Sequence, residues 1–291
     1  RSVHDLFRVG GQPHHVLGNG RGAHLLLSEV SLDEPDLRRA AGWPHLAFET
    51  IGSTNTEASR LVINGEHDRI WVTAREQVSG RGRRGREWQS PKGNLFASAA
   101  FPVQADGSMP LTGLPLLASL ALRDAVADVA PALAHQLGLK WPNDLLLDGK
   151  KLAGILLEST AYEQGSVIIT AGFGVNCAWH PKQALYATTS LREEGVLVSA
   201  DDLFAPLALR FDHWLTIWDS GRGTAAVRNG WLAHAVGLGE PLVARYSDGE
   251  VHGTFESLDQ NGFLMLRDSM GDLRQISAAD IFFGNLHKAG A

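Results

Sequence analysis

The chain has 291 residues, of which 44% are hydrophobic and 20% are charged, and it contains 8 Trp and 11 Phe. This apolar content is enough for a sizeable core and excludes wholesale disorder. The formal net charge is −6, from 26 Lys and Arg against 32 Asp and Glu. Such a charge argues against binding to nucleic acid through a general positive field.

Neither a membrane segment nor a secretory signal is predicted. The longest apolar stretch, residues 111–122, is short and is interrupted by Thr112, Gly113 and Pro115. The single cysteine, Cys177, cannot form an internal disulfide, so nothing in the chain requires an oxidising compartment. The first residues lack a basic flank followed by an apolar run. We therefore expect a cytoplasmic protein.

Residues 1–44 are rich in Gly and His and show only a weak helical pattern, near residues 37–41. We interpret them as an extension with little core of its own. The segment contains no helix-turn-helix pattern and is too short for a winged-helix module, so no DNA binding is expected.

From residue 45 to residue 236, patterns typical of strands and helices are interspersed. Strands are predicted at residues 70–74, 94–101 and 167–175, a hairpin at 144–158, and helices at 112–129, 201–218 and 224–236. Each of the last two helices begins at an N-cap candidate. This mixture predicts one folded domain of strands and helices over residues 45–236.

The pattern changes from Glu240 onward, where short alternating runs are separated by turn clusters at residues 247–249, 259–262 and 269–272. Turns at this spacing predict a small β-barrel of about five strands over residues 239–288. The glycines of residues 237–239 mark the junction between the two domains.

Residues 80–88 read Gly-Arg-Gly-Arg-Arg-Gly-Arg-Glu-Trp, and the region from Arg75 to Lys92 has six basic residues against two acidic ones. The glycines match G-x-G-x-x-G, but Gln89-Ser-Pro91 follows where a dinucleotide fold needs a helix. We interpret the segment as a mobile loop whose guanidinium groups hold phosphate or carboxylate oxygens. A solvated segment or a nucleic-acid tether is the alternative. Trp88 either stacks on a purine or is an ordinary core residue.

A second cluster is Lys140-Trp-Pro-Asn-Asp144, followed closely by Lys150-Lys-Leu-Ala-Gly154. Pro142 disfavours helical geometry at Trp141, so a lysine and an amide are expected at the start of a strand. Lys151 on the far arm of the hairpin could point inward and supply a point charge to a reacting carboxylate or phosphate. For Lys150 we prefer a solvated turn position.

Two further segments each allow a structural and a ligand-binding interpretation. Ser53-Thr-Asn55 is a helix N-cap cluster whose exposed groups could also bind a polar ligand. The glycines of Gly172-Phe-Gly-Val-Asn176 indicate close backbone approach by a ligand. Cys177 is expected to be a small buried hydrophobe. The scattered histidines and the absence of G-x-S-x-G argue against a zinc site and a serine hydrolase.

Together these segments resemble the biotin protein ligases. The runs that carry the resemblance occur in the family's order over roughly residues 45–180: Ser53-Thr-Asn55, Gln77-Val-Ser-Gly-Arg-Gly-Arg-Arg-Gly-Arg-Glu-Trp88, Lys140-Trp-Pro-Asn-Asp144 with Lys151-Leu-Ala-Gly-Ile155, and Gly172-Phe-Gly-Val-Asn176. The arginine loop combined with Lys-Trp-Pro-Asn-Asp is highly specific. The resemblance implies an α+β fold, in which a ligase-type catalytic domain with a mixed sheet and packed helices is followed by a small SH3-like β-barrel.

It also implies the reaction, in which the biotin carboxylate attacks the α-phosphate of ATP to give biotinyl-5′-adenylate, and a carrier lysine then releases AMP. Mg²⁺ is expected with ATP, with ligands that the sequence does not identify. The implied biotin-binding residues are Ser53, Thr54, Asn55, Gln77, Arg81, Gly82, Arg83, Lys151 and Gly154. The implied ATP-binding residues are Arg83, Arg86, Trp88, Lys140, Asn143 and Asn176. Lys151, Arg83 and Arg86 are the implied catalytic residues.

The implied partner is the biotin carboxyl carrier domain of a biotin-dependent carboxylase. Because the extension is short, we expect a monofunctional ligase, and the resemblance allows a homodimer through the strand at residues 167–175. Three alternatives remain: a lipoate or octanoate ligase or transferase of the same fold, a nucleic-acid-binding protein that uses residues 81–86, and a biotin-binding protein without turnover. The first uses an R-x-S-G-G-type run that this chain lacks.

Overall fold

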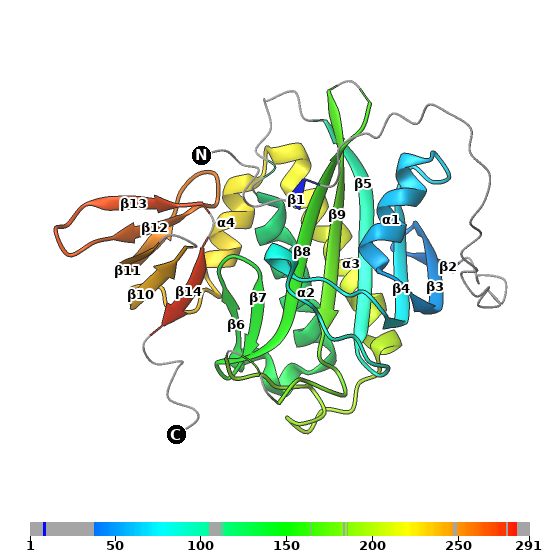
Figure 1. The fold of residues 1–291 in the computed structure, drawn as a ribbon, viewed down its shortest axis with the longest axis horizontal. Coiled ribbons are helices and arrows are strands. Elements are labelled where there is room, and N and C mark those ends of the chain that lie inside the picture. The colour runs from blue at the N-terminus through cyan, green and yellow to red at the C-terminus, as the bar shows by residue number, and fades with distance from the viewer. Residues whose placement is uncertain are drawn as a thin grey trace, which may run out of the picture.

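The computed structural model describes residues 8–9, 38–104, 111, 113–163, 165–182, 184, 186–246, 249–277 and 279–283. Two sheets organise these residues, a large one that carries the helices and a small one at the C-terminal end (Figure 1). Among the described residues, no helix is long and apolar enough to cross a membrane.

The large sheet has nine strands, in the order β2-β3-β4-β5-β9-β8-β7-β6, with β1 paired to β8. Its strands are β1 (Arg8–Val9), β2 (Arg38–Ala40), β3 (Trp43–Ile51), β4 (Ile70–Gln77), β5 (Leu95–Gln104), β6 (Leu137–Lys140), β7 (Asp144–Leu147), β8 (Lys150–Ala161) and β9 (Ser166–Val175). The pairs β3–β4 and β1–β8 are parallel and the others are antiparallel. The predicted strands, the hairpin and the mixed sheet are confirmed. Because β9 is paired along both edges, it has no free edge for pairing with a second copy.

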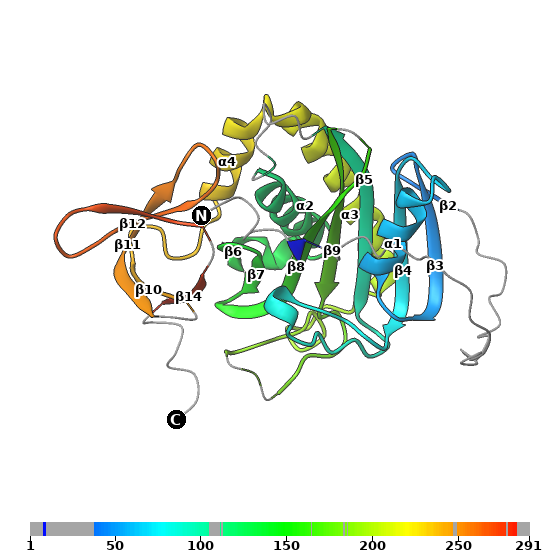
Figure 2. The same cartoon turned by 45° about the horizontal axis from the view of Figure 1, so that its top comes forward.

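Helices cover both faces of this sheet (Figure 2). They are α1 (Thr54–Ile63), α2 (Gly113–Val129), α3 (Ala200–Trp218) and α4 (Thr224–Leu232). Alternation along β4 explains the two layers, because Ile70 and Val72 pack with α1 while Trp71 faces the larger core that contains α2 and α3. Strands covered on both faces are apolar almost throughout, as the burial of β5 illustrates.

The predicted helix starts are only partly correct. Ser199 caps α3 through a complete capping box with Asp202, whereas the N-cap of α4 is Gly223, which has no side chain to donate or accept. The predicted end of α4 at Val236 is also wrong, because residues after Leu232 leave the helix to pair with β6. Leu139 donates to the carbonyl of His234 (2.8 Å) and accepts from the amide of Val236 (2.9 Å).

The weak helical pattern near residues 37–41 is wrong as well. Arg38–Ala40 forms β2, which turns back onto β3 through Ala41 and Gly42, both at positive φ. Trp43 is 1% exposed and packs against Trp71, so the core of the large sheet already begins within the predicted extension. Most of residues 1–37 lie outside the described residues.

The small sheet has five antiparallel strands in the order β13-β12-β11-β10-β14, so the number of strands that the turn spacing predicted is confirmed, whereas no pairing that closes a barrel is found among the described residues. They are β10 (Pro241–Arg245), β11 (Glu250–Leu258), β12 (Leu264–Arg267), β13 (Leu273–Ile276) and β14 (Asp280–Phe283). Trp231 of α4 packs on Phe255 of β11, and Trp141 donates to the carbonyl of Gly262 (3.1 Å). The two sheets are therefore joined by buried contacts, which place β14 beside the turn between β6 and β7.

Candidate functional site

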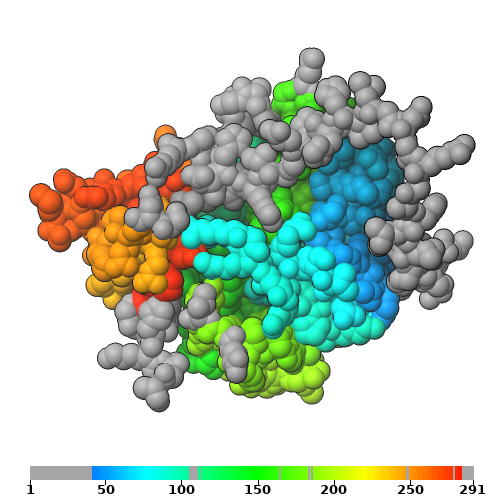
Figure 3. Space-filling view, viewed as in Figure 1, coloured from blue at the N-terminus to red at the C-terminus, as the bar shows by residue number. Residues whose placement is uncertain are grey.

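A cavity of about 320 Å³ lies where the arginine loop (residues 80–88), β8, β9, the segment after β9 and β14 meet. Figure 3 shows the cyan arginine loop across the middle of one face, between the C-terminal sheet and the yellow-green segment. Every residue predicted for the site lies on the cavity wall: Ser53, Thr54, Asn55, Gln77, Arg81, Gly82, Arg83, Arg86, Trp88, Lys140, Asn143, Lys151, Gly154 and Asn176. The segments are far apart in the sequence, so the fold brings them together as the motifs required.

One end of the cavity is lined by neutral polar groups at the start of α1. The backbone amide and the hydroxyl of Thr54 both donate to Gln77 Oε1, at 2.8 and 3.0 Å. Gln77 Nε2 donates to Ser90 Oγ (3.1 Å). Ser53 occupies the N-cap position, as predicted, but its side chain makes no capping hydrogen bond. This leaves its buried hydroxyl beside the cavity.

Asn55, like Gln77, makes three hydrogen bonds through its side chain at this neutral end. It accepts a hydrogen bond from Ser98 (2.6 Å) and donates to Glu158 Oε2 (2.9 Å) and to the Leu156 carbonyl (3.3 Å). Glu158 also lies 3.8 Å from the guanidinium of Arg81. The side chains of Thr54, Asn55 and Gln77 thus have hydrogen-bond partners within the protein in the absence of a ligand.

At the two strand glycines, Gly172 and Gly174, the atoms that approach the backbone closely belong to side chains of this protein, whereas the sequence predicted a ligand there. A Cβ on Gly172 would lie 2.0 Å from Asn55 Oδ1, and one on Gly174 would lie 2.5 Å from Trp88 Nε1. The sequence interpretation therefore located the close approach correctly but not its partner. Gly154 opposes Trp88 in the same way, at 3.1 Å.

Trp88 is half-buried on the cavity wall, with its ring over these glycines. Its indole Nε1 is buried and has no hydrogen-bond partner among the described residues. Lys151 Nζ lies 5.4 Å from its ring centroid. An aromatic face on the wall of a cavity, held by close packing from behind, is suited to stacking.

The other end of the cavity gathers cations. Arg83 Nη1 donates to Asn143 Oδ1 at 3.3 Å, and Lys140 Nζ lies 5.2 Å from the ring centroid of Tyr186 and 5.9 Å from that of Phe282. Within the described ranges, neither Arg83 nor Lys140 has a carboxylate oxygen within 4.0 Å. Burial lowers the pKa of Arg83 and the pKa of Lys140.

Lys151 lies between the two ends and points inward, as predicted. Its Nζ pairs with Asp144 Oδ1 at 2.7 Å, and both side chains are about one-seventh exposed, at 14% and 13%. Lys150 instead pairs with Glu194 (2.8 Å) at 40% exposure, outside the cavity. The preference for Lys150 as a turn lysine exposed to solvent is consistent with this position.

The position of Lys140 differs from the prediction. It ends β6 rather than opening a strand, and the turn through the cis Trp141–Pro142 bond leads to Asp144, where β7 begins. The two amides also have structural partners, since Asn143 donates to the Ile155 carbonyl (2.6 Å) and Asn176 donates to the Thr189 carbonyl (3.0 Å). They brace the wall at the cation end.

The C-terminal sheet contributes residues that no motif indicated. Arg84 and Arg86 both donate to Asp280 Oδ2 of β14, which ties the arginine loop to that sheet. The hydrogen bond with Asp280 raises the pKa of Arg86, and a smaller contribution comes from Tyr186. Tyr186 and Asp280 come from an unpatterned segment and a short strand, so only three-dimensional packing reveals them.

Cys177 is buried as expected, and burial raises the pKa of its thiol to about 11. Within the described part of the chain, no group of three or more His, Cys, Asp or Glu side chains could hold a metal ion. The cavity wall does carry the carboxylates of Asp144 and Asp280, and each already pairs with a cation.

Comparisons with known proteins agree with this geometry. A model described as the biotin/lipoate A/B protein ligase family matches residues 47–176, and one described as the biotin protein ligase C terminal domain matches residues 237–284. A biotin--[acetyl-CoA-carboxylase] ligase of Paracoccus denitrificans is 43% identical over 239 residues, which cover 80% of this chain and 97% of the relative. A ligase of the same description from Mycobacterium tuberculosis is 30% identical over 88% of this chain and 95% of the relative.

The solved structures agree at the level of the fold. The biotin protein ligase from Aquifex aeolicus in complex with biotin and ATP has a TM-score of 0.68 at 22% identity, over 82% of this chain and 99% of that one. The biotin protein ligase from Leishmania major in complex with biotinyl-5-AMP has a TM-score of 0.55 at 27% identity, over 80% and 98%.

Proposed function

The chain belongs to the biotin/lipoate A/B protein ligase family and is a biotin protein ligase, and from this premise we propose which parts of its cavity perform each step. In the first step the carboxylate of biotin attacks the α-phosphate of ATP, giving biotinyl-5′-adenylate and pyrophosphate. In the second, a lysine of the carrier attacks the acyl carbon and AMP leaves. Neither step needs a nucleophile from the enzyme. Its task is to position the reactants, stabilise charge on the phosphate and exclude water.

The neutral end, around Thr54, Asn55 and Gln77, is proposed to hold the head of biotin. The head is an uncharged urea fused to a sulfur ring, and it requires fixed donors and acceptors rather than charge. Ser53 and the backbone of residues 81–83 complete this end of the cavity, and Gly154 lies on the wall beside it. The satisfied network described above supports the assignment, because rigid polar groups lose little entropy on binding.

The cation end is proposed to hold the phosphates of ATP. The observation that carries this proposal is the pair of cations, Arg83 and Lys140, that line the cavity with no carboxylate oxygen of the described residues within 4.0 Å, although Asp144 and Asp280 act on both at longer range. Unpaired buried charge is costly in a folded protein, and a bound anion removes that cost. Arg86 would reach the phosphates by exchanging Asp280 for them. Trp88 would stack on adenine, and Asn143 and Asn176 would brace the nucleotide.

Lys151 is proposed as the essential cation at the reacting carboxylate and α-phosphate. It lies between the two ends, and its pairing with Asp144 holds Nζ in place. A fixed ammonium at this position stabilises the charge that develops on the phosphate oxygens. Mg²⁺ would arrive with the phosphates of ATP, because this ion is commonly held by substrate phosphates and one or two carboxylates. Asp144, Asp280 and Glu87 are the acidic residues on the wall of the cavity among those described.

The proposed acceptor is the biotin carboxyl carrier domain of a biotin-dependent carboxylase, since the Paracoccus relative is described as a ligase for acetyl-CoA carboxylase. We retain residues 45–236 as the catalytic domain, residues 239–288 as the C-terminal domain, and the cytoplasm as the location. A homodimer also remains a proposal, although not through the edges of β9. The nucleic-acid reading of residues 81–86 loses support, because Arg81, Arg84 and Arg86 contact the protein itself.

The test is ATP–pyrophosphate exchange with purified protein and Mg²⁺, with biotin, lipoate and octanoate compared at equal concentrations. Exchange with biotin alone supports the adenylation step and the pocket assignment together. Exchange with lipoate or octanoate instead would keep the fold and overturn the assignment of the neutral end. Absence of exchange with all three acids would overturn the proposed chemistry.

A further inference from the structure

A short segment after β9 is bonded to the backbone of Lys151 on both sides. The amide of Lys151 donates to the Ala187 carbonyl (2.8 Å), and the amide of Thr189 donates to the Lys151 carbonyl (3.0 Å). These two bonds fix the position of the backbone that carries the essential cation. The same segment includes Tyr186, whose ring centroid lies 5.6 Å from Lys151 Nζ. Contacts that fix the position of residues 186–189 therefore also fix the backbone of Lys151 and the aromatic ring beside its ammonium group.

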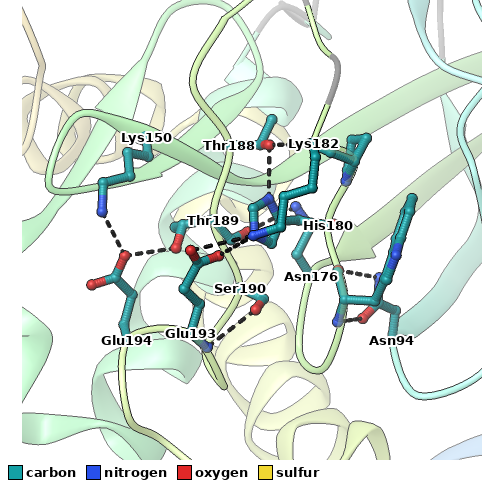
Figure 4. A network of polar contacts seen from close by, with 12 residues as sticks. Asn94, Lys150, Asn176, His180, Lys182, Thr188, Thr189, Ser190, Glu193 and Glu194 are labelled. Carbon is teal, nitrogen blue, oxygen red and sulfur yellow. Dashed lines mark hydrogen bonds and ion pairs between the residues drawn. The ribbon is translucent and has the colours of Figure 1, made fainter. Parts of the chain in front are cut away.

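A network of polar side chains holds this segment in place (Figure 4). Thr188 Oγ1 donates its single proton to the Pro181 carbonyl (2.6 Å) and lies 2.9 Å from His180 Nδ1. Since that proton is already used, His180 Nδ1 must be the donor in the second contact. Thr189 Oγ1 donates to Glu194 Oε1 (2.6 Å) in the same network.

His180 is buried at 6% exposure, and its second ring nitrogen is also partnered. Nε2 contacts the Glu193 carboxylate and lies 2.9 Å from Lys182 Nζ, which is in turn 3.1 Å from that carboxylate. The imidazole is therefore oriented from one side and holds Thr188 on the other. Pro181 and Thr188 line the cavity, whereas His180 does not.

We propose that His180 is a positioning residue for adenylation, which acts through Thr188 to hold residues 186–189 against Lys151. The proposal rests on the proposed function of the cavity. Loss of the imidazole would remove the Nδ1 donor from Thr188 Oγ1, leave that hydroxyl held by the Pro181 carbonyl alone, and loosen the two backbone bonds to Lys151. The neutral end would be unaffected, because α1, β4 and β5 hold it through separate bonds.

The experiment measures ATP–pyrophosphate exchange for the wild type and for His180→Ala, His180→Asn and Thr188→Val. For His180→Ala we expect kcat to fall on the order of 10- to 100-fold, the scale of a misplaced catalytic group, while the KM for biotin stays unchanged. His180→Asn keeps a donor near the position of Nδ1 and should recover part of the loss. The double variant His180→Ala/Thr188→Val should be no worse than the more impaired single variant, because the two residues act in one chain of contacts.

His252→Ala is the matched control, since His252 contacts Glu250 (2.8 Å) on the exposed side of the C-terminal sheet. It should exchange at the wild-type rate. An unchanged kcat for His180→Ala would overturn the inference. Additive losses of kcat in the double variant would also overturn it, and so would a rise in the KM for biotin as large as the rise in the KM for ATP. A wild type that fails to exchange would instead refute the proposed function, so the two failures are distinguishable.

Discussion

The two ends of the cavity differ in how completely their polar groups are satisfied. At the neutral end, Thr54 and Gln77 are hydrogen-bonded to each other. Gln77 and Asn55 are also bonded to side chains of the surrounding protein, at ordinary distances. At the cation end, Arg83 and Lys140 have an amide and aromatic rings as partners instead of carboxylates. The first arrangement suits a neutral ligand that enters a rigid socket. The second leaves two cations compensated only at longer range, by Asp144 and Asp280, and so favours an anionic ligand.

The largest effect is expected where the two ends meet. Lys151→Ala should reduce adenylate formation by about 10²–10³-fold or more in kcat, the scale for removing one charge-stabilising group. Pyrophosphate exchange measures the loss, and circular dichroism with thermal melting checks the fold, because Asp144 is left unpaired. Lys92→Ala is the control, since Lys92 pairs with Glu49 at 57% exposure away from the cavity. Normal exchange by folded Lys151→Ala would remove Lys151 from its proposed role.

A second variant isolates the cation end. Arg83→Ala should weaken ATP binding by about 1.5–3 kcal/mol, roughly 10- to 100-fold in KM for ATP, because it deletes a charge-assisted contact to phosphate. The KM for biotin should change little. Arg84→Ala is the neighbouring control, since Arg84 points to Asp280 and is not on the cavity wall. If Arg83→Ala raised the KM for biotin as much as that for ATP, the division into two ends would fail.

The two strand glycines allow the ends to be perturbed separately on one strand. Gly174→Ala should push Trp88 from the wall and raise the KM for ATP, whereas Gly172→Ala should displace Asn55 and raise the KM for biotin. Each added methyl costs about 1–3 kcal/mol as overpacking, so changes of roughly tenfold are expected. Gly52→Ala is the control, because a Cβ there meets nothing within 4 Å. Equal effects of both strand variants on both substrates would contradict the separation.

The sequence predicted residues that line the cavity because each lies in a short motif that the family resemblance identified. The arginine loop, Lys140-Trp-Pro-Asn-Asp144 and Lys151 are contiguous patterns, and all reach the cavity. Tyr186 and Asp280 were missed because their roles arise from packing between distant segments. The predicted end of α4 was wrong for a related reason, because the pairing of residues 234–236 with β6 overrides their local helical propensity. A pattern thus predicts a residue's type of environment better than its partner.

The smallest expected effect concerns the charge of Lys140. Burial lowers its pKa, so it loses its proton at a lower pH than a solvated lysine does. As pH rises through that lowered pKa, the cation end loses charge and the KM for ATP should rise, by less than about tenfold. The stability effect has the opposite sign. Between the lowered and the ordinary pKa the unfolded chain binds more protons, so Lys140 makes the free energy of unfolding increase with pH.

Lys140→Arg separates this contribution from the other titrations, because a guanidinium stays protonated across the accessible range. The variant should lose the alkaline rise in the KM for ATP that the wild type displays, while the pH profile of the KM for biotin stays the same in both proteins. The measurement is kcat/KM for ATP in pyrophosphate exchange from neutral to alkaline pH, since this parameter reports groups in the free enzyme. Identical alkaline profiles for the two proteins would show that the cation end does not depend on Lys140. The asymmetry between the ends would then rest on Arg83 alone.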